Sequence, residues 1–328
     1  MPAEKAGIVA SARRSLRPGT SLGRRRLAEV ALLLLMLSWA VNFIVVKGTG
    51  SEIPPMTFGA VRFTVGGLLL LGLLRWREGT IGLPRADVVP IAILGVLGFG
   101  IYQVLWASAI QLITAGDSAL LIAATPVLAV LIAVIARSDH LTPAKLAGAL
   151  ISFVGVAVVV GRGASGDQFS LLGDLVTLAA AACWAVYTSY IARYLRRHSA
   201  LAIAAWAALF GALFLWPFGL VAALSVDWGR VGPLAYGGWL YSAVLSAGLG
   251  NIILYDAIRL LGPARATAFQ FLVPLFTVII GALILAEPVR VAQVIGGTII
   301  VVGVLLTRRG GLARAPEAVS GISSLPAE

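Results

Sequence analysis

The sequence predicts an all-α integral membrane protein. We expect ten transmembrane helices as two inverted five-helix repeats, with both termini in the cytoplasm. Three observations predict this fold: the composition, the placement of the basic residues and an internal repeat. Of the 328 residues, 59% are hydrophobic and 12% are charged, whereas a soluble domain carries about a quarter charged residues. The mean hydropathy of +0.97 agrees with a chain that lies largely in lipid.

Long runs without charge, and one run interrupted by Arg62 alone, give the predicted helices. Most of them reach the ~17–25 residues that a helix needs to cross the hydrocarbon core. The alternation typical of outer-membrane strands is absent from the sequence, so helices are the expected spanning structure. The ten predicted spans are Val30–Val46, Pro55–Leu74, Val88–Gly116, Ser118–Ala136, Leu146–Gly161, Leu175–Ala192, Ser199–Val226, Val231–Tyr255, Ala266–Ala286 and Val291–Thr307.

The basic residues are placed asymmetrically about these spans. With the N-terminus inside, the predicted cytoplasmic segments hold 20 of the 25 lysines and arginines. Such a bias toward one side sets the orientation of membrane proteins. The net charge of +11 therefore reflects topology, and we expect no nucleic-acid partner.

The second half of the sequence repeats the first. A shift of 148 residues pairs Pro126 with Pro274, and a shift of 145 pairs Trp39 with Trp184. Each half has five spans, an odd number, so the second half enters the membrane from the opposite side. Inverted repeats of this kind place the substrate site near midplane between the halves. The predicted organisation is a basic cytoplasmic arm (1–27), two repeats (28–161 and 162–307) and a flexible cytoplasmic tail (308–328).

The sequence lacks the residue patterns of an enzyme. Its single cysteine, Cys183, lies within a span, and no zinc-protease, nucleophile-elbow or phosphate-loop motif is present. We therefore predict no catalytic residues, no metal site and no cofactor.

Several stretches resemble the drug/metabolite transporter superfamily, in the branch with two EamA-type repeats. They include "SWAVNF", "CWAVYT" and, most clearly, "RATAFQFLVPLFTVIIGALILAEPVRVAQVIGGTIIVVGV". The first repeat departs from the family pattern, with Asp139-His140 where a glutamate is usual. The resemblance implies a ten-helix bundle that exports small metabolites, often amino acids.

Polar and aromatic side chains share helix faces within the spans, because residues three or four apart lie on one face. Aromatic faces beside amide groups suit an amphipathic solute, and they attract an ammonium group through cation–π contact. The alternative is that the rings anchor the bilayer interface and the amides bridge helices. The predicted substrate-binding residues are Trp39, Asn42, Phe43, Tyr102, Gln103, Trp106, Trp184, Tyr187, Asn251, Tyr255 and Gln270.

Three further residues inside spans have a predicted role. Pro126 and Pro274 each remove a backbone hydrogen bond, so they either shape a moving helix or fix a kink for packing. Arg62 is a charge within an apolar span, where it costs about 2.5–3.5 kcal/mol on insertion scales. We expect it to reach the outer surface or to form a structural ion pair, with a substrate carboxylate as the alternative partner.

The predicted function is a secondary transporter in the plasma membrane, most simply a bacterial inner membrane. It would move small amphipathic metabolites, amino acids first, by alternating access. Its expected partners are the solute and the lipid bilayer. A homodimer is possible, but a monomer is sufficient for this function. A drug or other-metabolite exporter of the same class is the alternative, and a lipid-modifying membrane enzyme or a channel is more remote.

Overall fold

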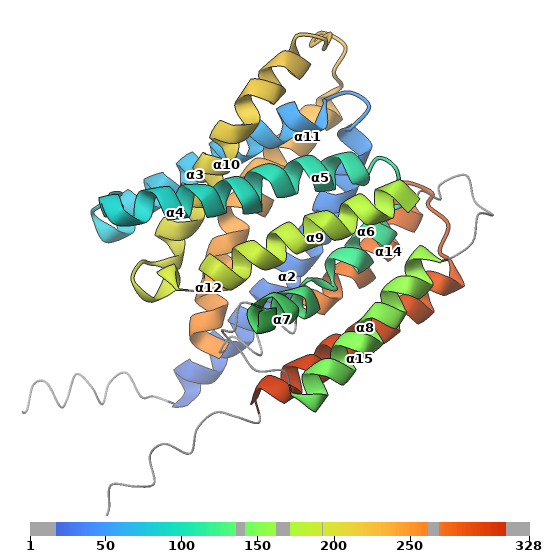
Figure 1. The fold of residues 1–328 in the computed structure, drawn as a ribbon. Coiled ribbons are helices and arrows are strands. Elements are labelled where there is room, and N and C mark those ends of the chain that lie inside the picture. The colour runs from blue at the N-terminus through green and yellow to red at the C-terminus, as the bar shows by residue number, and fades with distance from the viewer. Residues whose placement is uncertain (1–17, 136–141, 162–170, 192, 262–268, 313–328) are drawn as a thin grey trace, which may run out of the picture.

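The computed structural model describes residues 18–135, 142–161, 171–191, 193–261 and 269–312, and all regular structure in these ranges is helical (Figure 1). Within them, eight helices are long and apolar enough to cross a bilayer. Two shorter apolar helices follow at Phe269–Ile284 and Val291–Thr307. The predicted all-α class is confirmed for this part of the chain, and the count of ten spans stays a prediction.

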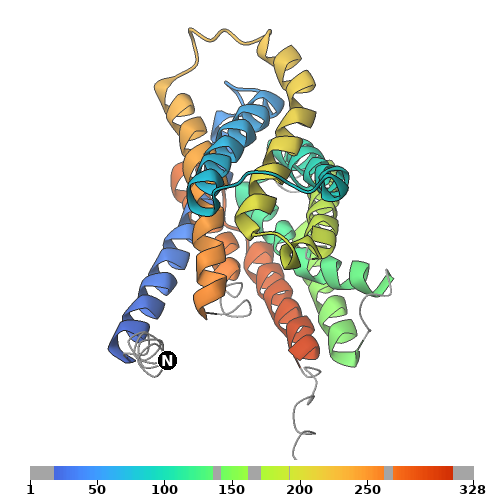
Figure 2. The same cartoon turned by 90° about the vertical axis from the view of Figure 1, so that its left-hand side faces the viewer.

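The helices follow the same order in both halves. The first half comprises α2 (Pro18–Thr49), α3 (Pro55–Glu78), α4 (Arg85–Gly95), η1 (Val96–Ile101), α5 (Tyr102–Ala109), α6 (Ala115–Ile122), α7 (Thr125–Ile135) and α8 (Pro143–Val160). The second half comprises α9 (Leu171–Ile191), η2 (Tyr194–Arg196), α10 (Ala200–Ala223), α11 (Pro233–Tyr241), η3 (Ser242–Leu249), α12 (Gly250–Leu261), η4 (Phe269–Phe271), α14 (Leu272–Ile284) and α15 (Val291–Leu312). The helix α2 starts and α15 ends at the same end of the bundle (Figure 2).

The third span of each half contains a π-helical segment. A shift of 148 residues lays η1 on the last six residues of η3, so the two segments occupy equivalent places in the repeat. A π turn holds one residue more than an α turn and occurs frequently at functional sites. The repeat read from the sequence is therefore also visible in the local backbone.

The structure corrects one predicted boundary. The run Val88–Gly116 was expected to be a single span, but its helix ends at Ala109 and the next helix begins at Ala115. The Thr114 side chain accepts a hydrogen bond from the Asp117 backbone N–H at 3.0 Å and caps α6. Asp117 thus lies in the first turn of the next helix, where a carboxylate is favoured by the helix dipole.

Each half packs its first helix into the other half. The helix α2 contacts η3, α12 and α14, whereas α9 contacts η1, α5, α6 and α7 (Figure 1). Equivalent helices also pair directly, α3 with α10 and α8 with α15. The two halves therefore share one interior between them.

Four glycines let α8 and α15 approach closely. A methyl group on Gly155 would lie 2.7 Å from the Gly296 carbonyl oxygen, and one on Gly303 would lie 2.6 Å from the Gly148 carbonyl oxygen. The shift of 148 residues converts Gly148 into Gly296 and Gly155 into Gly303, so it exchanges these two contacts. Small residues at such seams are typical of membrane helix pairs, because lipid provides no hydrophobic drive for association.

A hydrogen bond lies at the centre of this glycine seam. The Ser152 hydroxyl donates to the Ile300 carbonyl oxygen at 3.2 Å. The shift of 148 residues lays Ser152 on Ile300, so the bond joins two equivalent positions. The pseudo-two-fold axis that relates the halves accordingly passes between these residues.

The outer surface of the helices is apolar. On α2, Leu32 and Met36 are fully buried, whereas Leu33, Leu34 and Leu37 are exposed. Similar exposed leucines, isoleucines and valines occur along α3, α4, α8, α10 and α14. An apolar exterior of this extent is suited to lipid rather than water.

The glycine seam yields a prediction on stability. Gly155→Val should destabilise the protein by about 1–3 kcal/mol, because the added atoms overlap the α15 backbone. Thermal unfolding of the purified protein in detergent measures the loss. The matched control is Gly72→Val in α3, where a methyl group meets nothing within 4 Å. Equal melting temperatures for the two variants would contradict the seam.

Candidate functional site

A continuous chain of aromatic side chains links helices of both halves. Its members come from α2, α3, η1 and α5 in the first half and from α9 in the second. Each ring contacts the next at a centroid distance of 5.1–6.1 Å, within the range of favourable aromatic pairs. In order, this aromatic chain consists of Phe43, Trp106, Tyr102, Trp184, Tyr187, Phe99 and Phe63.

The aromatic chain crosses between the halves at Tyr102 and Trp184, whose ring centroids are 5.4 Å apart. The Tyr102 ring stacks on Trp106 with an interplanar angle of 8°. The indole nitrogen of Trp106 donates to the Ser118 hydroxyl at 3.2 Å, so α6 holds this ring in place. The rings thus form an ordered apolar surface where the halves meet.

Five of the predicted binding residues belong to the aromatic chain: Phe43, Tyr102, Trp106, Trp184 and Tyr187. Phe99 and Phe63 were not predicted. A signal for Phe99 was present, because it lies three residues before Tyr102 and so shares its helix face. Phe63 directly follows Arg62 in α3, but it shares no helix face with another predicted aromatic residue.

Trp39 and Asn42 bind the π-helical segment of the other half. The Trp39 indole nitrogen donates to the Ser246 carbonyl oxygen at 3.3 Å. The Ser242 hydroxyl donates to Asn42 Oδ1 at 2.6 Å. In this conformation the two side chains bridge helices at the junction of α2 with η3, which the sequence offered as the alternative for the amide but not for the indole.

The remaining predicted residues of the second half are Asn251, Gln270 and Tyr255. Asn251 donates through its amide nitrogen to the Ala247 carbonyl oxygen one turn earlier, at 2.8 Å. Gln270 is half-buried in η4. Tyr255 lies in α12, but its side chain is outside the described part of the structure.

The two prolines lie near the start of equivalent helices. Pro126 is the second residue of α7, directly after a turn that separates α6 from α7. Pro274 is the third residue of α14, directly after η4. In the first turn of a helix the backbone N–H groups have no intrahelical acceptor, so a proline there removes no hydrogen bond. Each proline therefore marks a break in its span rather than a kink within a helix.

Arg62 and Gln103 are buried with polar atoms that have no protein partner. Arg62 is 8% exposed and Gln103 is fully buried. Among the described residues, no group forms a hydrogen bond with Nε or Nη1 of Arg62. The same is true of the amide nitrogen and oxygen of Gln103. The guanidinium lies over the Phe63 ring, 4.9 Å from its centroid. Reaching the outer surface and forming an ion pair, the two expectations for Arg62, are therefore not what the structure shows.

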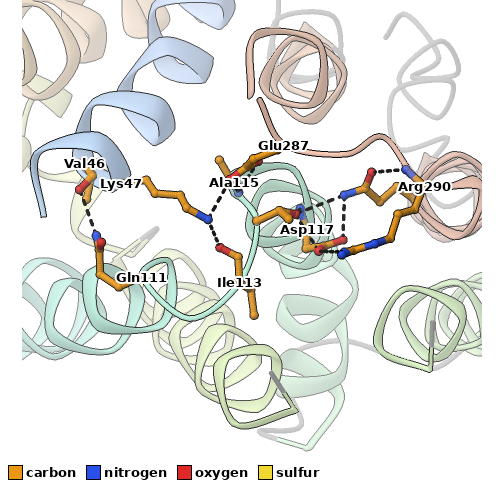
Figure 3. Close-up of polar contacts among 10 residues, drawn as sticks. Val46, Lys47, Gln111, Ile113, Ala115, Asp117, Glu287 and Arg290 are labelled. Carbon is orange, nitrogen blue, oxygen red and sulfur yellow. Dashed lines mark hydrogen bonds and ion pairs between the residues drawn. The ribbon is translucent and has the colours of Figure 1, made fainter. Parts of the chain in front are cut away.

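A second polar group, the end cluster, lies where the C-terminal end of α2 meets the start of α6 and the loop between α14 and α15 (Figure 3). On the predicted topology this end is external. The Lys47 ammonium lies 2.8 Å from the Glu287 carboxylate and also donates to the Ile113 carbonyl oxygen. The end cluster consists of Lys47, Thr114, Asp117, Glu287, Arg290 and Gln293.

Both acidic side chains of the end cluster are placed at the N-terminus of α6. Asp117 belongs to its first turn, and Glu287 reaches it from the loop after α14. Glu287 accepts the backbone N–H of Ala115 with both oxygens at 2.9 Å. Asp117 accepts from the Gln293 amide at 3.1 Å and lies 3.7 Å from the Arg290 guanidinium. Negative charge at a helix N-terminus is stabilised by the free N–H groups there.

The ion pairs of the end cluster join the two halves. Glu287 pairs with Lys47, and Arg290 faces Asp117. These contacts join residues far apart in sequence, and no local pattern indicates them.

A surface pocket of about 370 Å³ lies beyond the end of α2 and is separate from the aromatic chain. It is formed by the loop after α2 and the loop before α11. Its lining residues are Gly50, Ser51, Glu52, Pro54, Ser225, Val226, Asp227, Arg230 and Val231. The described residues also contain no group of three or more His, Cys, Asp and Glu side chains that could hold a metal ion.

Comparison with known proteins identifies the class of this bundle. The model of the EamA-like transporter family matches residues 26–161 and 171–309, which cover both halves. The chain belongs to the EamA-like transporter family. It is therefore a multi-pass membrane transporter and not an enzyme, which confirms the family resemblance noted in the sequence.

Several relatives of this EamA-like transporter align over almost their whole length. A probable terminal-alkyne amino-acid exporter of Streptantibioticus cattleyicolor is 30% identical, with 88% of this chain and 95% of the relative covered. The aromatic amino acid exporter YddG of Ancylobacter novellus is 29% identical, with coverages of 84% and 96%. An uncharacterized transporter of Archaeoglobus fulgidus is 28% identical, with coverages of 85% and 96%.

A solved crystal structure shows the same fold. It superposes on this EamA-like transporter with a TM-score of 0.59 and 22% sequence identity. The match covers 89% of this chain and all of the other one.

The end cluster yields a prediction on stability. Glu287→Ala should destabilise the protein by about 1–3 kcal/mol, because the Ala115 N–H and the Lys47 ammonium lose their acceptor. Thermal unfolding in detergent measures this change. The control is Glu52→Ala, which removes an acceptor for the Gly232 N–H at an exposed position. A melting temperature as high as that of the control would count against the end cluster as a tie between halves.

Proposed function

We propose that this transporter is a secondary carrier that exports amino acids across the plasma membrane by alternating access. The observation that carries the proposal is the aromatic chain, because its rings come from both halves and meet where the halves join. Transporters with inverted repeats bind their substrates at such a junction. The names of two relatives, both amino-acid exporters, support the substrate class.

An amino acid suits these surroundings chemically. Ring faces offer apolar contact to its side chain and attract its ammonium group, each such contact contributing about 0.5–2 kcal/mol. Trp39 and Trp184 hold equivalent positions in the repeat, one on each side of the junction. We therefore propose that they contact the solute, together with Tyr102 and Tyr187.

Alternating access requires each end of the path to open in turn. In this conformation the end cluster ties α2 to the loop between α14 and α15, and ties α6 to the start of α15. Opening this end requires the separation of Lys47 from Glu287 and of Asp117 from Arg290 and Gln293. We propose that Pro126 and Pro274, at the breaks in their spans, permit the accompanying change in helix direction.

Counterflow in proteoliposomes tests the carrier and its site. Vesicles preloaded with unlabelled amino acids should accumulate labelled phenylalanine, and Trp39→Ala/Trp184→Ala should lower the initial rate at least about tenfold, since two ring contacts are lost. The matched control is Trp76→Ala, which removes a side chain that is 80% exposed.

The outcomes separate the parts of the proposal. Exchange that survives the double substitution would keep the carrier and remove the proposed site. If folded, inserted protein exchanged no amino acid, the same assay with amines and drugs would test the other exporters of this class.

The alternating movement is tested by labelling a cysteine from outside the cell. In a Cys183→Ala background, Tyr102→Cys places a thiol on the proposed path. Adding Lys47→Met should speed its reaction with an impermeant maleimide in intact cells, because the closed end loses the ion pair with Glu287.

The control acts at the opposite end of the bundle. Asp87→Asn weakens the contact of that carboxylate with His198, whose Nε2 lies 2.8 Å away. It should not speed labelling from outside. Equal labelling rates for Lys47→Met and the parent protein would contradict the role of the end cluster in closing the path.

A further inference from the structure

Arg62 is a buried cation without a partner among the described residues. Its Nε and Nη1 atoms are enclosed by protein, and its guanidinium lies 4.9 Å from the centroid of the Phe63 ring. A ring face attracts the cation but accepts none of its hydrogen bonds in their favoured directions. An arginine within a membrane span normally pairs with an acidic group, pairs with backbone carbonyls or reaches the interface. In this conformation the described part of the chain supplies none of these for Nε and Nη1.

Gln103 lies against the same face of α3. A methyl group on Gly59 would come within 2.6 Å of Gln103 Cγ, so the absence of a side chain at Gly59 admits the glutamine. Gly59 precedes Arg62 by three residues and therefore shares its helix face. Gln103, like Arg62, is buried with its polar atoms unpaired.

The surroundings place this pair where the halves meet. Gly66, one turn after Arg62, packs against Ala243 and Ala247 of η3. The Phe63 ring, which the Arg62 guanidinium lies over, belongs to the aromatic chain. The unpaired groups therefore adjoin the aromatic chain and elements of both repeats.

We infer that Arg62 and Gln103 form a carboxylate-binding subsite of the transport path. The inference rests on the proposed function and names the group of the substrate that is recognised. A guanidinium offers N–H donors in a planar fork that matches a carboxylate, and the Gln103 amide adds a further donor. The Phe63 ring and the adjoining aromatic chain provide an apolar wall for the rest of the solute.

The subsite explains selectivity through charge. A solute with a carboxylate neutralises the buried cation, whereas a solute that lacks one leaves the Arg62 charge uncompensated in a medium of low polarity. A site built on buried polar groups rejects analogues that do not pair with them. We therefore expect an amino acid to be carried and its carboxamide to be excluded.

The test compares L-phenylalanine with L-phenylalaninamide in the counterflow assay. The wild-type protein should exchange the acid at least about tenfold faster than the amide. Arg62→Gln should reduce this ratio to near one. Arg62→Lys keeps the charge without the planar fork, so its ratio should lie between those of Arg62→Gln and the wild type. Arg75→Gln, on the exposed end of the same helix, is the control and should keep the wild-type ratio.

A second variant tests Gln103 without removing the cation. Gln103→Glu supplies a carboxylate beside Arg62 and should compete with the solute, so that exchange of phenylalanine falls at least about tenfold in folded protein. Unchanged exchange would overturn the assignment of Gln103.

The wild-type protein alone also decides the inference, whatever the variants do to folding. Equal exchange of phenylalanine and its amide would overturn the subsite while the carrier stands. Exchange of the amide alone would overturn it as well. If neither these two compounds nor any other amino acid were exchanged, the proposed function would fall, and the inference with it.

Discussion

The structure depends on the exchange of first helices between two inverted halves. In lipid, apolar surfaces gain little by meeting one another, so helices associate through close backbone packing and polar contacts. Here α2 lies among helices of the second half and α9 among helices of the first. The glycine seam of α8 and α15 adds a close contact between equivalent helices. With each half completed by a helix of the other, the junction between them becomes the interior of the protein.

Polar groups are used sparingly, and many of them lie at this junction. Trp39 and Asn42 bond to η3, and the end cluster joins α2 and α6 to the loop after α14. Such bonds have directions, so they set the rotation of a helix where apolar packing alone would tolerate several. Arg62 and Gln103 lie in the same region with unpaired atoms. Some polar groups at the junction thus hold the helices together, whereas others have hydrogen-bonding atoms without a partner. Unpaired groups of this kind are suited to binding a solute.

The sequence predicted the class and the repeat because both depend on local composition. Runs without charge locate helices, and the equivalence of Trp39 and Trp184 is a matter of spacing. The sequence also predicted five members of the aromatic chain, since shared helix faces follow from helical geometry. Contacts between helices were not predictable in this way. The pairing of Lys47 with Glu287 depends on how α2 enters the second half, and the burial of Arg62 depends on the rotation of α3 against α5 and η3. The end of the third span was misplaced because the break after Ala109 contains no charge, and the next helix begins after the Thr114 cap within the same uncharged run.

The pairing of Lys47 with Glu287 has a consequence for biogenesis. Glu287 follows Lys47 by 240 residues in the chain. At about 5–20 residues per second, roughly 12–50 seconds of synthesis separate the two. For most of this interval, until residues 250–284 have been made, α2 lacks α12 and α14, which supply much of its packing surface. Lys47 lies in the last turn of the helix. Its ammonium group can therefore stay hydrated at the membrane surface while the remaining helices are made. The first helix to enter the bilayer is therefore among the last to reach its final contacts.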